Sequence, residues 1–507
     1  MNLLTEKWLP VRPLEGGKIC WIRLSDLLTK EKEYEICFPR DDLELAALQL
    51  VICIVQVLFT PKDLRELIDN FRKPMSEKEY LDGIVTYTDW FDMEHPQYPF
   101  MQVHGVKAKI ETSVDKLMAG LTGATNSCFV NEPGLADQIC AGCAAISLFN
   151  QASNAPSFGG GFKGGLRGGA PITTLIQGRH LRETIWLNIL SSLQLGESIP
   201  NHKENLQQPP TWVYPIKENS DIPAASIGLL RGLFWQPAHV ELCPSISEGD
   251  CGCCGRNQVA IYACFLKEKF KYTVEGVWPH PHSPRKLTFK KGEDEVRFAS
   301  FTTAAPTWTR LASFVVQKQI NENQKEGNQP AAVVIQARKL YSRRPERLRL
   351  AIGGYRNNQA SILERRHELF DLNVGWHQHP GQIQEIVDLG IGYKVTLRKA
   401  LYVFSKGLKD VKGAGIAVQE LGVKQFYRRT DNLMQKALAE AHFEDPEQLA
   451  ADKDNLRAEL KRQCIQNFEE QTKPYLHDPE LIRTMAVARR KLFKNLKALE
   501  PEPAGGK

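Results

Sequence analysis

The last quarter of the chain carries apolar residues at a helical period, and this pattern constrains the fold more than any other feature. One stripe recurs at heptad-like spacing and consists of Leu449, Leu456, Leu460, Cys464 and Phe468. A second stripe consists of Leu481, Met485, Ala488, Leu492 and Leu496. Breaks near 406–415, 443–446 and 473–479 divide the region into four helices with short connections. We therefore predict an antiparallel four-helix bundle over residues 381–500, followed by a disordered tail at 501–507.

The preceding three quarters of the chain, residues 1–375, mix strand-like and helical segments without a βαβ rhythm or an internal repeat. The sequence therefore predicts an α+β protein, in which a large, irregular, mixed α/β N-terminal domain precedes the bundle. The longest apolar run, Leu45–Phe59, has 15 residues. It is too short to cross a membrane and is typical of a buried helix that starts at Asp41 or Asp42. Because Met1–Pro10 lacks the features of a secretion signal, we expect a cytoplasmic protein with no membrane association.

An amide-rich stretch, Asn357-Asn358-Gln359, follows the glycine pair Gly353-Gly354. Between residues 338 and 366, nine Lys or Arg face only two acids. Because the whole chain carries a net charge of only +6, nucleic-acid contacts must come from local patches such as this one. Ser361 and Glu364 have the spacing of a capping box, which predicts a helix that starts at Ser361, with the amides just before its first turn. Those amides could either address bases or simply cap the helix.

Seven glycines fall between residues 159 and 169. The stretch contains a G-x-G-x-x-G pattern, but no helix can continue through glycines 164, 165, 168 and 169, so a dinucleotide site is excluded. Such a bare backbone, flanked by Lys163 and Arg167, can approach another surface closely, and a DNA minor groove about 6 Å wide is one such surface. A flexible surface loop or a lid is the alternative.

Lysines suited to phosphate or groove contacts occur at two further places. The stretch Phe265–Lys271 alternates three lysines with other residues, as on a strand face or around a short turn, and contains Lys267. Lys290-Lys291-Gly292 is typical of a hairpin turn that touches phosphates without sequence preference. The motif Trp278–Pro284 holds two histidines, but its prolines favour an ordered, buried loop over a metal site.

Two C-x-x-C pairs supply four thiols in the pattern of a structural zinc site: Cys140, Cys143, Cys251 and Cys254. The pairs lie about a hundred residues apart, so the fold must bring them together. Reduced core cysteines are the alternative, and Cys253 or Cys243 could take the place of Cys251. A thioredoxin-type redox pair is disfavoured because neither pair follows a clear strand-to-helix pattern.

Taken together, these motifs resemble the CasA family, the large subunit of the type I-E CRISPR Cascade complex. The resemblance covers essentially the whole chain and is carried by Met1–Leu4, Phe38–Ala47, Phe158–Phe162, Phe265–Phe270, Trp278–Pro284 and Gly353–His367. It implies a non-catalytic subunit of an RNA-guided antiviral ribonucleoprotein. In this family the subunit recognises the protospacer-adjacent motif in double-stranded DNA, opens the duplex to start R-loop formation, and recruits the helicase-nuclease.

The resemblance also assigns roles to individual residues. The minor-groove contacts are Gly159, Gly160, Gly161 and Lys267. The wedge that separates the first base pair is formed by Asn358, Gln359 and Ala360, with Arg356 in support. A loop that contacts the guide RNA 5′ handle or the neighbouring backbone subunit contains Phe129 and Asn131.

Further expectations concern partners and rival functions. Lys163, Lys290 and Lys291 are expected to contact DNA without sequence preference. The implied partners are target DNA, guide RNA, the backbone and small Cascade subunits and the helicase-nuclease. One departure is Ser157, where the family pattern leads us to expect another glycine. A nuclease would need clustered acids, which the sequence disperses, and a free-standing RNA-binding protein would not call for a glycine loop with an amide wedge.

Overall fold

The computed structural model describes residues 1–120, 136–199, 202, 208–290, 293–320, 325–413 and 415–500. The chain divides into two compact units. Unit 1 consists of Met1–Ala304, Gln317–Leu340 and Arg349–Leu369, and unit 2 consists of Ala305–Val316, Tyr341–Leu348 and Phe370–Lys507. Unit 2 thus takes in two short segments that precede the predicted bundle, and the boundaries at 375 and 381 stay a prediction. Across the described ranges, each helix is too short or too polar to span a bilayer.

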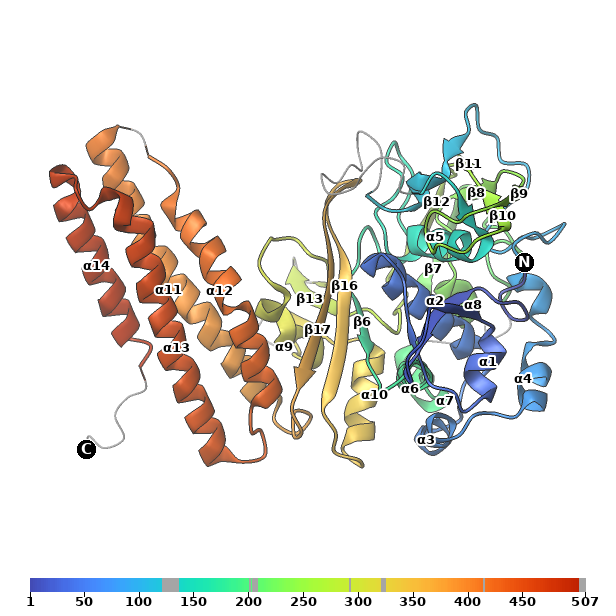
Figure 1. Ribbon diagram of the computed structural model, residues 1–507, viewed down its shortest axis with the longest axis horizontal. Helices are drawn as coiled ribbons and strands as arrows, with labels where there is room; N and C mark the ends of the chain where they lie inside the picture. The colour runs from blue at the N-terminus through green and yellow to red at the C-terminus, as the bar shows by residue number, and fades with distance from the viewer. Residues whose placement is uncertain are drawn as a thin grey trace. The chain divides into compact units, whose positions relative to one another are not determined.

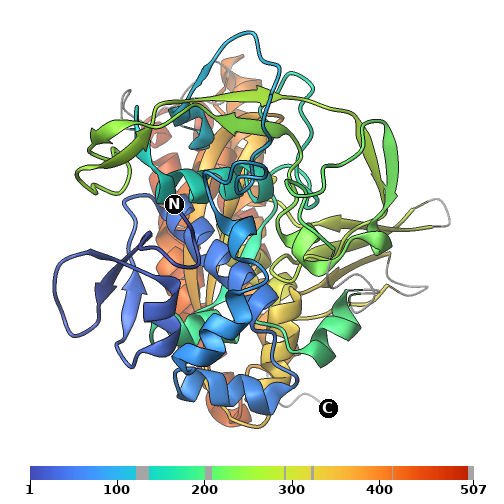
Figure 2. The same ribbon diagram turned by 90° about the vertical axis from the view of Figure 1, so that its right-hand side faces the viewer.

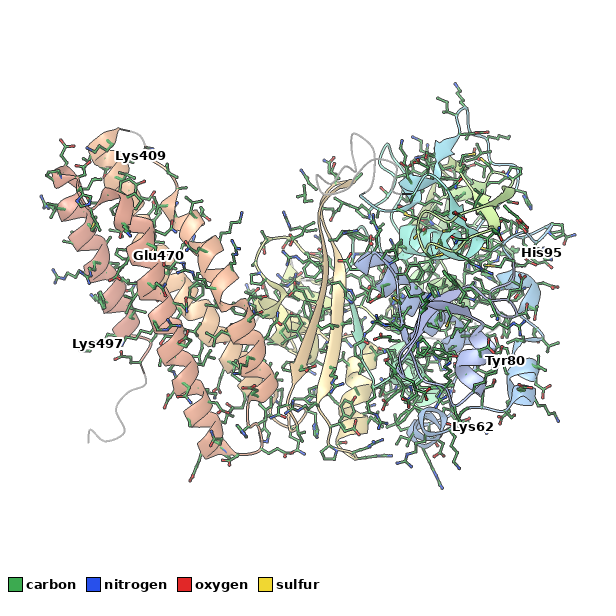
Figure 3. The ribbon with its side chains drawn as sticks, in the orientation of Figure 1. Lys62, Tyr80, His95, Lys409, Glu470 and Lys497 are labelled. Atoms are coloured by element: carbon green, nitrogen blue, oxygen red, sulfur yellow. The ribbon has the colours of Figure 1, made fainter. Side chains whose placement is uncertain are left out.

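Unit 1 combines helices with small sheets, and the pairing of β7 (Ser220–Pro223) with β12 (Tyr272–Glu275) is parallel. Its helices are α1 (Leu24–Thr29), α2 (Asp41–Leu58), α3 (Leu64–Arg72), α4 (Glu77–Ile84), α5 (Ala141–Ser153), α6 (Leu181–Leu187), α7 (Ser192–Ser198), α8 (Leu229–Leu233) and α10 (Ala332–Tyr341). In Figure 2 the blue N-terminal helices gather in the lower half of this unit, and green strands cross its top. Tyr80 on α4 donates its hydroxyl to the Leu4 carbonyl at 2.6 Å, which ties that helix to the N-terminal segment (Figure 3).

The strands form six small sheets among the described residues. Their bounds are β1 (Leu9–Pro13), β2 (Cys20–Ile22), β3 (Tyr34–Ile36), β4 (Thr112–Ser113), β5 (Ile139–Cys140), β6 (Thr173–Ile176), β7 (Ser220–Pro223), β8 (His239–Leu242), β9 (Ile246–Gly249), β10 (Val259–Tyr262), β11 (Cys264–Glu268), β12 (Tyr272–Glu275), β13 (Arg285–Lys290), β14 (Glu293–Phe298), β15 (Glu326–Gln329), β16 (Leu348–Asn358) and β17 (Ser361–Leu372). Their orders are β2-β1-β3, β5-β10-β9, β4-β11-β8, β12-β7, β14-β13-β15 and β17-β16-β6. The mixed α/β character predicted for the N-terminal part is therefore confirmed.

Helix α2 forms the centre of unit 1. It starts at Asp41, as predicted, and nearly every residue from Asp42 to Gln56 is buried. The chain approaches it closely at Gly353 on β16, where a Cβ would lie 2.4 Å from the Leu45 side chain. Any larger residue would push β16 away from α2, so this glycine is required by packing.

The stretch after Gly353 is a long β-hairpin, and the helix predicted from Ser361 is wrong. Strand β16 runs to Asn358 and β17 starts at Ser361, so Gln359 and Ala360 form a two-residue turn (Figure 1). Gln359 has a φ of +54°, which such a tight hairpin turn demands. Glu364 does not cap a helix but pairs with Arg356 across the hairpin at 2.7 Å. The capping-box spacing here is therefore coincidental.

Unit 2 contains the predicted bundle, with its four helices side by side in Figure 1. They are α11 (Pro380–Lys412), α12 (Val418–Glu440), α13 (Pro446–Thr472) and α14 (Ile482–Lys497), and α9 (Leu311–Val315) packs on α11. The whole first stripe predicted from the sequence is buried on α13. On the surface, Glu470 of α13 accepts a hydrogen bond from Arg429 of α12 at 2.7 Å, and Figure 3 labels it between Lys409 and Lys497. The four-helix prediction is confirmed.

Candidate nucleic-acid interface

The glycine loop of unit 1, Phe158–Phe162, follows α5 and adopts a backbone that only glycine accepts readily. Gly159, Gly160 and Gly161 have φ values of +76°, +57° and +86°. The loop closes through a hydrogen bond from the Phe162 amide to the Gly159 carbonyl at 3.0 Å. Because L-residues avoid positive φ, the backbone conformation disfavours side chains at all three positions. Gly160 and Gly161 are exposed, so the bare backbone faces outward.

Lys267 lies on strand β11 against the aromatic ends of this loop. Its ammonium nitrogen is 4.6 Å from the ring centre of Phe158 and 5.7 Å from that of Phe162. Burial lowers the pKa of Lys267, and the nearby Lys116 lowers it further. Among the described residues no carboxylate pairs with Lys267, and its ammonium lies against aromatic faces. The side chain is thus an oriented cation next to the loop.

The sequence reading missed Lys269 as part of this site. Its ammonium donates a hydrogen bond to the Gly160 carbonyl at 2.8 Å, and a Cβ on Gly161 would lie 3.3 Å from the same nitrogen. It was detectable only as one of three alternating lysines. Its role is to hold the loop backbone in place.

The hairpin turn meets the glycine loop. A Cβ built on Gly159 would lie 3.2 Å from the Cβ of Ala360, so the two backbones come close together. Asn358 and Gln359 are exposed beside that contact, and Asn357 donates its side-chain amide to the Gln359 carbonyl at 2.5 Å. The structure therefore brings together three features far apart in the sequence: the loop Phe158–Phe162, Lys267 and the turn of Gln359 and Ala360. We call this group the tip cluster.

The hairpin is held firmly just below its turn. Buried Tyr355 donates its hydroxyl to the Asp42 carboxylate at 2.8 Å and accepts the Asn150 amide at 2.8 Å, which ties β16 to α2 and α5. Burial would raise the pKa of Glu364, but hydrogen bonds from Arg366 and Arg356 outweigh it and lower the pKa overall. Arg356 is thus committed to an ion pair that braces the two strands.

The cations flanking the glycine stretch have structural contacts. Lys163 donates to the Tyr272 carbonyl and lies 4.8 Å from that ring centre. Arg167, expected at the surface, is instead only 3% exposed. It donates to the Ser283 hydroxyl at 2.7 Å and the Ser153 carbonyl at 2.9 Å, and burial lowers its pKa to about 9. Arg167 therefore anchors the end of the glycine stretch in the core.

The backbone of Lys290, at the end of β13, lies in register opposite that of Glu293 on β14, which agrees with a hairpin at this point. Lys291, Phe129 and Asn131 lie outside the described residues. His280 and His282 are buried, as predicted for the Trp278–Pro284 loop.

The four thiols of the predicted zinc site come together. Antiparallel pairing of β5 with β10 brings the two C-x-x-C pairs to one place, and all four sulfurs lie within 4.8 Å of one another. The Sγ atoms of Cys140 and Cys254 are 3.7 Å apart. A tetrahedral zinc ion with Zn–S bonds of about 2.3 Å sets its sulfurs roughly 3.8 Å apart, so the group fits zinc. Hydrogen bonds from Cys140 and Cys143 lower the pKa of Cys251, which favours a thiolate ligand.

Neither of the two alternatives to Cys251 belongs to this group: Cys243 lies outside it, and Cys253 is buried nearby without being one of the four. The expectation about the strand-to-helix junction is not met. Cys140 ends β5 and is the N-cap of α5, so the first pair does stand at a strand-to-helix junction. Cys140 and Cys143 therefore differ from a redox pair because the second pair of cysteines lies close to them, and not because a strand-to-helix junction is lacking.

Comparisons with known proteins agree on one family. The profile described as CRISPR-associated protein Cse1 matches residues 2–466. A curated protein of Thermus thermophilus, "CRISPR-associated protein CasA/Cse1", is 26% identical over 265 residues, which is 49% of this chain and 49% of that protein. The chain thus aligns with about half the length of that curated relative.

Solved structures share the fold over nearly the whole chain. Thermobifida fusca Cse1 superposes with a TM-score of 0.74 at 16% identity, covering 98% of both chains. A chain from a structure titled "CRISPR RNA-guided surveillance complex" superposes with a TM-score of 0.64 at 15% identity, covering 97% of this chain and 99% of that one.

Proposed function

Because this chain belongs to the CRISPR-associated protein Cse1 family, we propose that it is the non-catalytic large subunit of an RNA-guided surveillance complex of the Cascade type. In this proposal the tip cluster reads the protospacer-adjacent motif in double-stranded DNA from the minor groove. It then wedges the duplex open to start R-loop formation, and the chain recruits the helicase-nuclease.

One observation carries the proposal: the exposed glycine backbone, an oriented cation and a turn bearing two exposed amides meet in one place. Residues 159 and 360 are in contact distance although two hundred positions separate them in the chain. Phe158, at the start of the loop, packs on Phe162 and on Lys267. Each feature alone has an ordinary structural explanation, whereas their convergence on one exposed surface supports a shared ligand.

Groove reading follows from the shape and charge of the loop. The backbone at Gly160 and Gly161 carries no side chain, so it can enter a minor groove about 6 Å wide. Lys267 supplies a positive charge next to it, and minor-groove potential attracts such cations. Because donor and acceptor patterns in this groove are degenerate, the site accepts several motifs and rejects others by shape.

Duplex opening follows from the stiffness of the hairpin. Asn358 and Gln359 project at the turn, and Tyr355 fixes the strand three residues earlier. Unstacking one base step costs on the order of a few kcal/mol, which groove and phosphate contacts offset. Pairing with guide RNA is then nearly balanced against the lost DNA duplex, so the wedge has only to start separation.

The other assignments complete the proposal. Phe129 and Asn131 contact the guide RNA 5′ handle or the backbone subunit, and the backbone and small subunits surround this chain in a cytoplasmic ribonucleoprotein. Lys290 and Lys291 contact DNA phosphates. Lys163 serves this purpose only if it leaves Tyr272. Zinc, held by the four thiols, is structural.

The test measures duplex binding by the reconstituted RNA-guided complex at one fixed salt concentration. The variant is Asn358→Ala with Gln359→Ala, and the targets carry or lack a permissive motif. A matched control exists in Asn257→Ala with Gln258→Ala, because this exposed pair has the same residue types and Gln258 has a similar φ of +53°.

We expect the tip variant to lose motif-dependent binding of closed duplex and to recover it on a target whose first base pairs are already mismatched. The control variant should bind as the wild type does. Equal binding of closed duplex by the tip variant and the wild type would show that the amides only close the hairpin turn.

A further inference from the structure

A second group of metal-ligating side chains lies in unit 1, apart from the four thiols. Glu111, Cys243 and Cys264 place one ligand atom each within 4.8 Å of one another. Cys264 donates its thiol to Glu111 Oε2 at 3.4 Å. None of the three residues belongs to the four-thiol group, and the protein function proposed above does not use them.

The fold brings these residues together through backbone pairing. Leu242 on β8 pairs with Phe265 on β11, and the Cys243 amide donates to the Cys264 carbonyl at 3.0 Å, so the two cysteines stand opposite each other. On the other side of β11, Ser113 of β4 pairs with Cys264, which carries nearby Glu111 to the same position. The arrangement therefore depends on strand register and not on a chance surface contact.

We propose that Glu111, Cys243 and Cys264 form a second zinc site. Two thiolates and one carboxylate supply three ligands, and a water molecule completes the tetrahedron. Thiolates select zinc among the common divalent cations, whereas calcium and magnesium prefer all-oxygen ligands. Both cysteines are half-buried and Glu111 is exposed, so the cation can enter from solvent.

The spacing agrees with zinc. With a Zn–S bond of about 2.3 Å and a Zn–O bond of about 2.0 Å, a tetrahedral ion sets sulfur and oxygen roughly 3.5 Å apart. The distance between Cys264 Sγ and Glu111 Oε2 is 3.4 Å. A disulfide between Cys243 and Cys264 would use the two sulfurs but would leave the carboxylate without a role.

Zinc at this site would fasten the surface loop 105–111 to the sheet that carries Lys267. Glu241 already accepts the backbone amides of Gly105 and Val106, at 2.9 and 3.0 Å, near the start of that loop. The site would add a tie at the other end, through Glu111. Two exposed lysines, Lys107 and Lys109, lie between the two ties and give trypsin a place to report on the loop.

The test counts and classifies bound cations on the reduced, full-length chain. We expect two zinc ions per chain, and, after exchange for ¹¹³Cd, two NMR resonances: one from four sulfurs and one from a mixed sulfur and oxygen set. Cys243→Ser with Cys264→Ser should hold one ion and lose the mixed resonance. Cys37→Ser, which alters another half-buried thiol, should keep both.

Glu111→Gln tests the site at an exposed position where folding is not at risk. Loss of this ligand should lower the affinity for the second zinc ion by about tenfold or more, because even changes to the partners of metal ligands lower metal affinity by that much. Zinc should also slow trypsin cleavage at residues 107 and 109 in the wild type and not in the serine variant. The proposal is overturned by a single ion on the wild type, by an unchanged count in the serine variant, or by a disulfide joining Cys243 and Cys264.

Discussion

Gly159 and Gly168 adopt nearly the same φ, +76° and +77°, but their surroundings differ. A Cβ on Gly159 would meet Ala360 at 3.2 Å, whereas a Cβ on Gly168 would meet nothing within 4 Å. The two positions therefore separate the cost of backbone strain from the cost of disturbing the tip cluster.

Replacing either glycine by alanine should destabilise the fold by about 1–2 kcal/mol, because both positions need a left-handed backbone. Only Gly159→Ala should also weaken motif-dependent duplex binding, since the added methyl group presses on the hairpin turn. Urea denaturation of both variants and duplex binding in the complex measure the two effects. Equal losses of duplex binding in Gly159→Ala and Gly168→Ala would mean that the contact between the loop and Ala360 does not affect DNA binding.

Residue type alone did not predict which cationic side chains are free of structural contacts and which are held by them. Lys163 and Lys267 both flank the glycine loop, yet Lys163 is tied to Tyr272, whereas Lys267 lies on aromatic faces. Arg167 is buried because hydroxyl and carbonyl acceptors from three other segments surround it. Ser283 is distant in the chain, and Ser153 and Thr173 belong to other segments that only the fold brings to Arg167, so the residue type alone holds no signal for this burial.

The β16–β17 hairpin illustrates how an element can be misassigned. The spacing of Ser361 and Glu364 satisfies a helical cap, but Glu364 instead joins Arg356 across two strands. The two-residue turn is hard to predict from the sequence, because Gln359 has a positive φ and glutamine is not typical of such turns. By contrast, α2 follows from a continuous apolar run and the bundle helices follow from a periodic apolar pattern. Both signals are local, and these helices were predicted correctly.

The hairpin depends on one buried hydroxyl. Tyr355→Phe should destabilise unit 1 by about 1–3 kcal/mol, because the Asn150 amide and the Asp42 carboxylate each lose a partner in a buried place. Tyr214→Phe is the control, because Tyr214 is 68% exposed. Chemical denaturation of both variants measures the free energy of unfolding. An unchanged free energy in Tyr355→Phe would mean that the hairpin is held by packing alone.

At the scale of the whole molecule, each compact unit has its own stabilising contacts. The four thiols join segments of unit 1 that lie about a hundred residues apart, while the bundle in unit 2 buries its own apolar stripes. The sequence predicted the bundle and the four thiols from local patterns. It placed the loop, Lys267 and the hairpin turn in one site only through family resemblance, because their contacts span the chain.

Removal of zinc by a chelator should therefore act locally. We expect faster amide hydrogen exchange around β5 and β10, whose pairing the thiols reinforce, and unchanged exchange in α11, α12, α13 and α14. Exchange measured by mass spectrometry with and without chelator checks this. Loss of protection throughout the bundle would contradict a local effect of zinc.

The succession of positive φ values at Gly159, Gly160 and Gly161 has a consequence for chirality. A D-amino acid prefers the mirror image of the backbone angles that an L-amino acid prefers, so this loop is conformationally right for residues that ribosomes do not supply. Gly160 has open space around its Cα. A semisynthetic chain with D-alanine there would stiffen the loop where L-alanine strains it, so the two enantiomers would separate rigidity from shape in target recognition.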